Sequence, residues 1–218
     1  MRRLPHPPAA SRQPPAAMLT ATALACSRGE RRLFDSLAFA LHGGDWLHVK
    51  GANGSGKTTL LRTLIGLSPA DAGSVRWGSA DIRDDRAGFR RACLYQGHAT
   101  ALKDDLTAPE NLRLALAIDG IAAAADASVD ALDQVGLADQ QWLPVRYLSA
   151  GQKRRVLLAR LLLRPADLWV LDEPLNALDA DASALLARLL RTHLDAGGMA
   201  VVTSHQPLAL DVGQELTL

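Results

Sequence analysis

One stretch constrains this chain of 218 residues more than any other, the glycine-rich run GANGSGKT from Gly51 to Thr58. It fits the pattern G-x-x-x-x-G-K-[ST], and it lies between the strand-like run 45–49 and a helix-like stretch from 57 to about 67. Glycines let the backbone curl so that successive N–H groups point inward, at the positive end of the following helix. The sequence therefore predicts a strand, a phosphate-binding loop and a helix in that order.

Two side chains of this loop have definite expected roles. Lys57 is predicted to reach the β- and γ-phosphates of a nucleotide, and Thr58 to offer its hydroxyl to Mg²⁺. The predicted nucleotide-binding residues are Gly51, Ala52, Asn53, Gly54, Ser55, Gly56, Lys57, Thr58 and Thr59.

A pair of carboxylates follows a second apolar run. Residues 168–171 are apolar without alternation, which is typical of a strand buried on both faces of a parallel sheet, and Asp172 and Glu173 come next. An acidic pair after a strand is often only a turn or a helix cap. Because a phosphate-binding loop lies upstream, we expect Asp172 to hold Mg²⁺ through water and Glu173 to act as general base.

The rest of the chain indicates an α/β fold with a helical insertion. Residues 92–95 form a short apolar run, and 199–203 repeat the unalternating pattern. Residues from about 106 to 164 have helical character, including an alanine-rich piece at 122–127, and Pro165 ends it. A chain of this length is long enough to form one substantial hydrophobic core.

Composition excludes several function classes. Lys+Arg 24 against Asp+Glu 23 gives a net charge of +1, so there is no basic field with which to bind nucleic acid. Cys26 and Cys93 stand far apart, so neither a disulfide framework nor a CxxC metal site is expected. No apolar stretch approaches the ~20 residues that span a bilayer.

The first 17 residues differ from everything that follows. They contain five prolines and almost nothing to bury, and no apolar segment follows the two early arginines. We therefore expect residues 1–17 to be a disordered extension, with Met18 as an alternative translation start. Residues 18–218 are then one domain, with a helical subdomain at about 98–163.

A third motif points to one nucleotide-binding family. The run LSAGQ, residues 148–152, precedes a leucine-rich stretch and lies about twenty residues before Asp172. Alone, Ser149 would be a helix cap and Gly151 a flexible turn. Together with the loop and the carboxylate pair, the run resembles the signature motif of the ATP-binding cassette (ABC) ATPases over about residues 19–218. The resemblance implies a P-loop NTPase of the ABC type, with a RecA-like core sheet, a small antiparallel β subdomain and a helical insertion.

The resemblance also implies the ligands, ATP and Mg²⁺, and further site residues. Asp179 resembles the D-loop aspartate, and His205 resembles the switch histidine that contacts the γ-phosphate. Gln96 resembles the catalytic Q-loop glutamine, which couples Mg²⁺ and the attacking water to a membrane partner. The segment between Gln96 and Leu106 is about two residues longer than is usual in the family.

Two further features concern the partner subunit and the adenine base of ATP. In this superfamily the signature of one subunit completes the ATP site of another, which implies a homodimer in which Ser149, Gly151 and Gln152 act in trans. Most members stack an aromatic side chain on adenine. Here Arg28 stands near that place, and a guanidinium plane can also stack on a base.

Local runs resemble one subfamily. YQGH at 95–98, LTAPENL at 106–112 and TSHQPL at 203–208 are similar to the CcmA family, the ATPases of bacterial cytochrome c maturation. The sequence departs from that family at Gln96, where an apolar residue is more usual. The alternatives are the ATPase of another ABC export system and a soluble ABC ATPase with no role in transport.

The subfamily resemblance implies a peripheral protein at the cytoplasmic face of the bacterial inner membrane. It would dock on a membrane subunit resembling CcmB, with CcmC and CcmD nearby, through the surface between about Gln96 and Gln152. ATP hydrolysis would then serve haem export or release of a haem-loaded chaperone. No direct haem contact is expected, and His98 is interpreted as a loop or interface residue.

Overall fold

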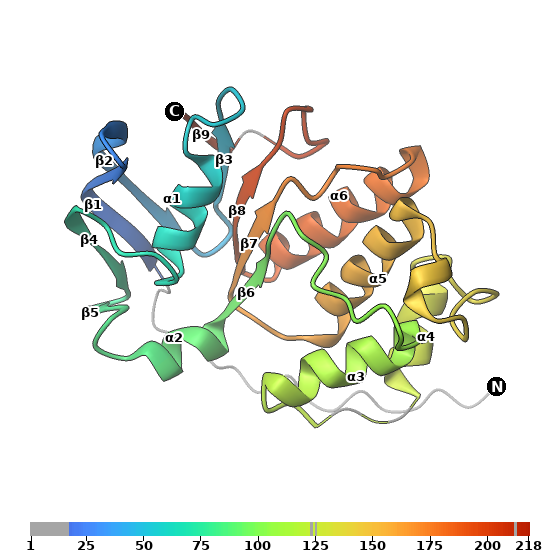
Figure 1. The fold of residues 1–218 in the computed structure, drawn as a ribbon. Helices are drawn as coiled ribbons and strands as arrows, with labels where there is room; N and C mark the ends of the chain where they lie inside the picture. Colours follow the sequence, from blue (N-terminus) through green and yellow to red (C-terminus); the bar gives the residue numbers. More distant parts are fainter. Residues whose placement is uncertain (1–17, 123, 125, 212) are drawn as a thin grey trace.

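A computed structural model describes residues 18–218 except 123, 125 and 212. The expected extension, residues 1–17, lies outside the described residues. The chain forms two sheets with helices around them (Figure 1). The strands are β1 (Met18–Arg28), β2 (Arg31–His42), β3 (Trp46–Lys50), β4 (Ala72–Trp77), β5 (Ala80–Asp81), β6 (Cys93–Gln96), β7 (Leu168–Asp172), β8 (Met199–Thr203) and β9 (Gln214–Thr217). The α-helices are α1 (Lys57–Leu64), α2 (Arg86–Ala92), α3 (Ala108–Ile118), α4 (Ala127–Gln134), α5 (Ala150–Leu163) and α6 (Ala180–Asp195).

The central sheet is parallel, in the order β6-β7-β8-β3-β9. All five residues of β7 and all five of β8 are buried, as their unalternating apolar runs predicted. Their side chains alternate between two cores. Leu168 and Val170 of β7 face the core beneath α1, whereas Trp169 and Leu171 face the core shared with α5 and α6. The predicted doubly covered parallel sheet is confirmed.

The second sheet is antiparallel, in the order β2-β1-β4-β5, and forms the small β subdomain. Its inner face, with Leu19, Leu24 and Leu41, shares a core with Leu60 and Leu61 of α1. The helix after the phosphate-binding loop is therefore packed between the two sheets, as Figure 1 shows.

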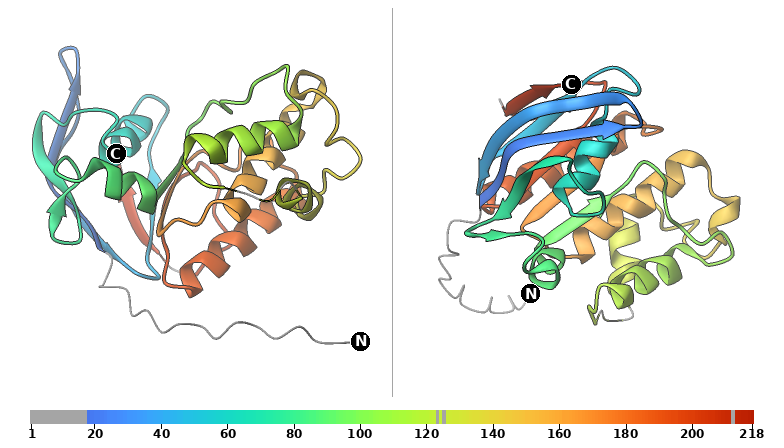
Figure 2. Two further views of the ribbon diagram at one scale, coloured as in Figure 1. Left: turned by 90° about the horizontal axis from the view of Figure 1, so that it is seen from below. Right: turned by 60° about the vertical axis from the view of Figure 1, so that its left-hand side comes forward.

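The helical part, α3 to α5, lies on the opposite side of the molecule from the antiparallel sheet (Figure 2). Thr107 and Glu110 form a capping box that starts α3. The Asn111 amide donates to the Lys103, Leu106 and Thr107 carbonyls, at 3.0 to 3.2 Å, and so holds the preceding loop against the helix. Among the described residues, no helix is long and apolar enough to span a bilayer.

Two predictions of helix differ from the structure, and in both places a glycine with positive φ follows a helix. The first helix ends at Leu64 rather than near 67, because Gly66 takes a φ of +71° and the Leu67 N–H donates to the Arg62 carbonyl. A similar turn with Gly120 at +72° follows α3. The prediction of helix at 122–127 was wrong at residues 122, 124 and 126, and α4 begins at Ala127.

Candidate functional site

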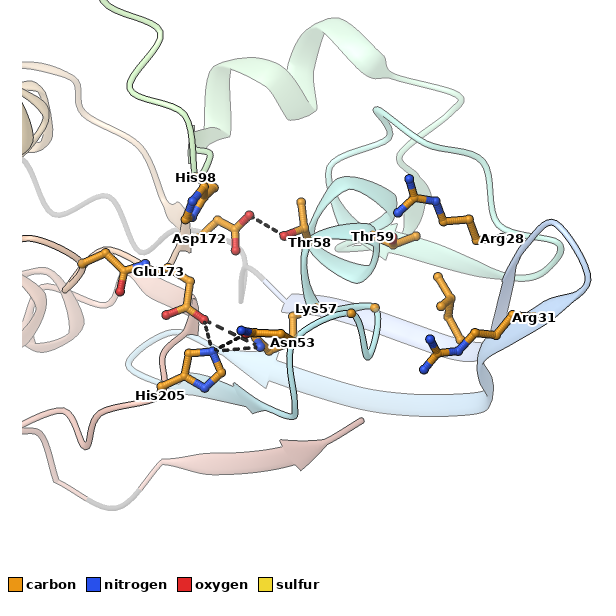
Figure 3. Close-up of a pocket in the computed structure, with 14 residues that line it drawn as sticks. Arg28, Arg31, Asn53, Lys57, Thr58, Thr59, His98, Asp172, Glu173 and His205 are labelled. Carbon is orange, nitrogen blue, oxygen red and sulfur yellow. Dashed lines mark hydrogen bonds and ion pairs between the residues drawn. The ribbon is translucent and has the colours of Figure 1, made fainter.

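Three neighbouring strands end at one edge of the parallel sheet, and each brings part of the site there. The loop 51–56 follows β3, Asp172 ends β7, and His205 comes two residues after β8. A pocket of about 640 Å³ opens at this edge. It is lined by Arg28, Arg31, Leu33, Asn53, Gly54, Gly56, Lys57, Thr58, Thr59, His98, Asp172, Glu173, Asn176 and His205, and most of these side chains are labelled in Figure 3.

Asp172 is held between two hydroxyl groups. Thr58 Oγ1 donates to Asp172 Oδ2 at 2.8 Å, and Thr203 Oγ1 donates to Asp172 Oδ1 at 2.8 Å. The carboxylate and the Thr58 hydroxyl are oxygen donors of the kind that Mg²⁺ prefers, and Mg²⁺ commonly takes only one or two protein oxygens beside phosphates and waters. The donor set therefore fits the predicted cation.

Glu173 follows Asp172 in a strained backbone conformation, with φ of +51°. Its N–H donates to Thr203 Oγ1 at 2.8 Å, so one threonine fixes both acidic residues. The residue is only 7% exposed, and its Oε1 lies 3.7 Å from Lys57 Nζ and 3.4 Å from His205 Nε2. The structure thus brings the predicted base, the predicted phosphate-binding lysine and the predicted switch histidine together.

Asn53 joins the same cluster. His205 Nε2 lies 3.0 Å from Asn53 Oδ1 and 3.4 Å from Lys57 Nζ. Lys57 Nζ also donates to the Gly51 carbonyl at 2.8 Å, which holds the loop in its curved form. Side chains that follow β3, β7 and β8 are therefore in contact with one another along the pocket, as the dashed lines in Figure 3 mark.

Sequence reasoning missed Arg154, a buried arginine of α5. Its Nε donates to the Pro174 carbonyl and its Nη2 to the Asp172 carbonyl, both at 3.2 Å, and Nη2 also donates to the Glu173 carbonyl. Burial lowers the pKa of Arg154, and the charges of Asp172 and Glu173 oppose that shift. Arg154 ties the helix after the LSAGQ run to the acidic turn. Nothing in the sequence distinguishes it from the chain's other arginines.

The signature residues lie elsewhere. Ser149 caps α5: the Gln152 N–H donates to Ser149 Oγ at 3.2 Å, and the Ser149 N–H donates to Gln152 Oε1 at 2.8 Å. Ser149 is exposed, and a Cβ added to Gly151 would lie 3.0 Å from the Ala177 carbonyl oxygen. Ser149, Gly151 and Gln152 are not among the described residues that line the pocket.

Asp179 also lies outside the pocket lining. It caps α6 by accepting from the Ala182 N–H at 2.8 Å, and both of its carboxylate oxygens lie 2.8 Å from Arg155 Nη2. The hydrogen bond from Arg155 lowers the pKa of Asp179. Asp179, the predicted D-loop residue, is thus attached to α5 through Arg155 rather than to the phosphate-binding loop.

The expected contact of Gln96 with this site is not found. Gln96 is 5% exposed, and its Nε2 donates at 2.5 Å to the Leu157 carbonyl of α5. Gln96 is not among the described residues that line the pocket, whereas His98, two residues later, is. The structure therefore does not bring Gln96 together with the other predicted site residues, and its catalytic role stays a prediction.

The opposite end of the pocket is formed by the β1–β2 turn. Arg28, the predicted base-stacking residue, lines this end together with Arg31 and Leu33, and Figure 3 shows both guanidinium groups far from the carboxylates. Arg31 was not predicted. A run of arginines in a turn gives no signal that separates a ligand contact from a solvated surface.

Comparison with known proteins agrees with this geometry. Residues 34–176 match the family model described as ABC transporter. The chain is 50% identical over 196 residues to the cytochrome c biogenesis ATP-binding export protein CcmA of Nitrosomonas europaea, covering 90% of this chain and 92% of that one. It is 49% identical over 201 residues to CcmA of Pseudomonas aeruginosa, covering 92% and 99%.

Solved structures show the same fold. An ABC transporter ATP-binding protein from Pyrococcus furiosus superposes with a TM-score of 0.80 at 22% identity, covering 92% of this chain and 97% of that one. An ATP-binding subunit of an ABC transporter superposes with a TM-score of 0.76 at 24% identity, covering 86% and 80%. The P-loop ABC fold expected from the sequence is confirmed, and the chain belongs to the ABC transporter ATPases and, among them, to the CcmA family.

Proposed function

We propose that this ATPase drives an ABC complex of cytochrome c maturation, coupling ATP hydrolysis to haem export or to release of a haem-loaded chaperone. The names of the CcmA relatives support the process. One observation carries the chemistry: Glu173 Oε1 lies within 3.7 Å of Lys57 Nζ and 3.4 Å of His205 Nε2 at the mouth of a pocket built on the phosphate-binding loop.

The site residues divide the hydrolytic step among them. Glu173 Oε1 takes a proton from the attacking water, whose oxygen bonds to the γ-phosphorus as the bond to the β-phosphate oxygen breaks. Lys57 offsets the charge that develops on the phosphates, and His205 holds the γ-phosphate. Bound Mg²⁺, held by Asp172 and Thr58, would neutralise phosphate charge.

A second copy of the chain completes the site. Ser149 is exposed and lies outside the pocket lining, so it can reach a γ-phosphate only across an interface. Head-to-tail pairing of two copies would bring Ser149, Gly151 and Gln152 of each onto the ATP of the other. ATP then closes the dimer and hydrolysis releases it.

The membrane partner would dock on the helical side. Trp142 and Tyr147 are 64% and 66% exposed there, inside the predicted docking region of about 96–152. Large exposed apolar side chains mark interaction surfaces. Their place supports docking on a CcmB-like subunit, with CcmC and CcmD nearby, at the cytoplasmic face of the bacterial inner membrane.

A haem-stained gel of cells that carry Glu173→Gln in place of the native protein tests the process. We expect loss of all c-type cytochromes while b-type haem proteins remain. Glu215→Gln, which changes an exposed glutamate of β9, is the matched control and should leave the c-type cytochromes intact. Normal c-type cytochromes in the Glu173→Gln strain would instead favour another ABC export system.

A further inference from the structure

His98 is the side chain that the segment after β6 presents to the nucleotide pocket. It lines the pocket with Thr58, Asp172 and Glu173. Figure 3 draws it at the same end of the pocket as Asp172, with Arg28 and Arg31 at the other end. Its position is therefore with the groups expected to hold the cation, and away from those at the base end.

The position of His98 along the chain agrees with this choice. It lies two residues after Gln96, the last residue of β6, in the segment that leads on to α3.

Gln96 is held inside the fold and away from the pocket. It ends β6, its Nε2 donates to the Leu157 carbonyl of α5, and the residue is buried. His98 is exposed at the pocket surface, where an incoming ligand can reach it.

We infer that His98 contacts the hydrated divalent cation that accompanies ATP, and so takes the place that the sequence assigned to Gln96. This inference rests on the proposed ATPase function. Mg²⁺ prefers oxygen ligands and keeps several waters, so an imidazole nitrogen suits a cation-bound water better than the ion itself. His98 is in this sense a positioning residue for the cation.

Binding of ATP measured by calorimetry, with Mg²⁺ or with EDTA, tests the inference. His98→Ala should weaken binding of ATP with Mg²⁺ about tenfold, the lower limit for loss of an outer-shell metal contact. ATP binding in EDTA should change less than twofold. His98→Gln should recover most of the loss, because an amide oxygen can also meet the cation or its water.

Mn²⁺ provides a second readout that does not depend on turnover. Free Mn²⁺ counted by electron paramagnetic resonance in the presence of ATP should show a cation Kd raised about tenfold in His98→Ala. Gln96→Leu tests the competing assignment and should change this Kd less than twofold. His42→Ala removes an exposed histidine of β2 outside the pocket and controls for loss of an imidazole.

Three results would overturn the inference. His98→Ala could bind Mn²⁺ and ATP as the wild type does, it could lose ATP equally in EDTA, or Gln96→Leu could cause the larger loss. Failure of the proposed function looks different, because the wild type would then bind no ATP or the c-type cytochromes would be normal in the Glu173→Gln strain.

Discussion

The polar side chains of the pocket and those at the start of α5 differ in burial and in the partners that they contact. At the pocket, Glu173 is buried and faces Lys57 and His205 of the same chain. At the start of α5, Ser149 is exposed and its hydroxyl accepts from the Gln152 N–H of its own capping box. Folding of one chain brings the polar groups of the first region together, so we call it the assembled region. The second leaves Ser149 exposed at the start of α5, and we call it the open region. A single chain thus brings Lys57, Glu173 and His205 together, whereas the proposed phosphate contact of Ser149 requires a second copy of the chain.

The largest expected effect removes the base from the assembled region. Glu173→Gln keeps the shape of the side chain but cannot take a proton from water, so turnover should fall about 10²- to 10⁴-fold. ATP binding should persist, and the protein should accumulate as a dimer in saturating ATP. Phosphate release and sedimentation measure the two effects. A monomeric variant with full turnover would contradict the role of Glu173.

The next prediction concerns the open region. Ser149→Asp retains a good helix cap but places a negative charge where a partner's γ-phosphate is expected. Hydrolysis and ATP-dependent dimerisation should fall at least about tenfold, the effect of roughly 1.4 kcal/mol of repulsion, while ATP binding by the single chain is unchanged. Ser149→Asn, a neutral cap of the same size, is the matched control. Equal activity of the two variants would show that Ser149 meets no phosphate.

Arg154 connects the two regions, and its loss should cost stability. Arg154→Met leaves the Asp172, Glu173 and Pro174 carbonyls without their buried donor, so the free energy of unfolding should fall by about 2 kcal/mol. Arg155→Met is the neighbouring control: it removes the pair with the exposed Asp179 and a hydrogen bond to the Val135 carbonyl, and it should lower the free energy of unfolding by less. Urea unfolding measures both. Equal losses in the two variants would mean that the buried contacts of Arg154 add no more to the free energy of unfolding than the exposed pair does.

The assembled region was the more predictable of the two from sequence. The loop 51–58 and the pair Asp172–Glu173 are contiguous runs that follow strands, and parallel strands bring such runs to one edge. The contacts of Arg154 and Thr203 join elements far apart in the chain, and no local pattern encodes them.

The place of Gln96 was less predictable. Side chains alternate along a strand, and at the end of β6 this alternation turns the Gln96 amide into the fold, while His98 of the following segment lines the pocket. The antiparallel sheet, likewise, was expected from the family resemblance rather than from the alternation of residues 18–42.

The smallest expected effect is a pH dependence at the open region. The Arg155 hydrogen bond lowers the pKa of Asp179, so the folded state releases this proton at lower pH than the unfolded chain does. The stabilisation is complete above the ordinary aspartate pKa of about 3.9 and is lost as pH falls through the lower folded value. The wild type should therefore lose this stabilisation below about pH 4, whereas Arg155→Met has none of it to lose. The difference in free energy of unfolding between the two proteins should become smaller as acid is added, as unfolding at a series of pH values would measure. A difference that stays constant into acid would mean that the Arg155 contact does not depend on the charge of Asp179.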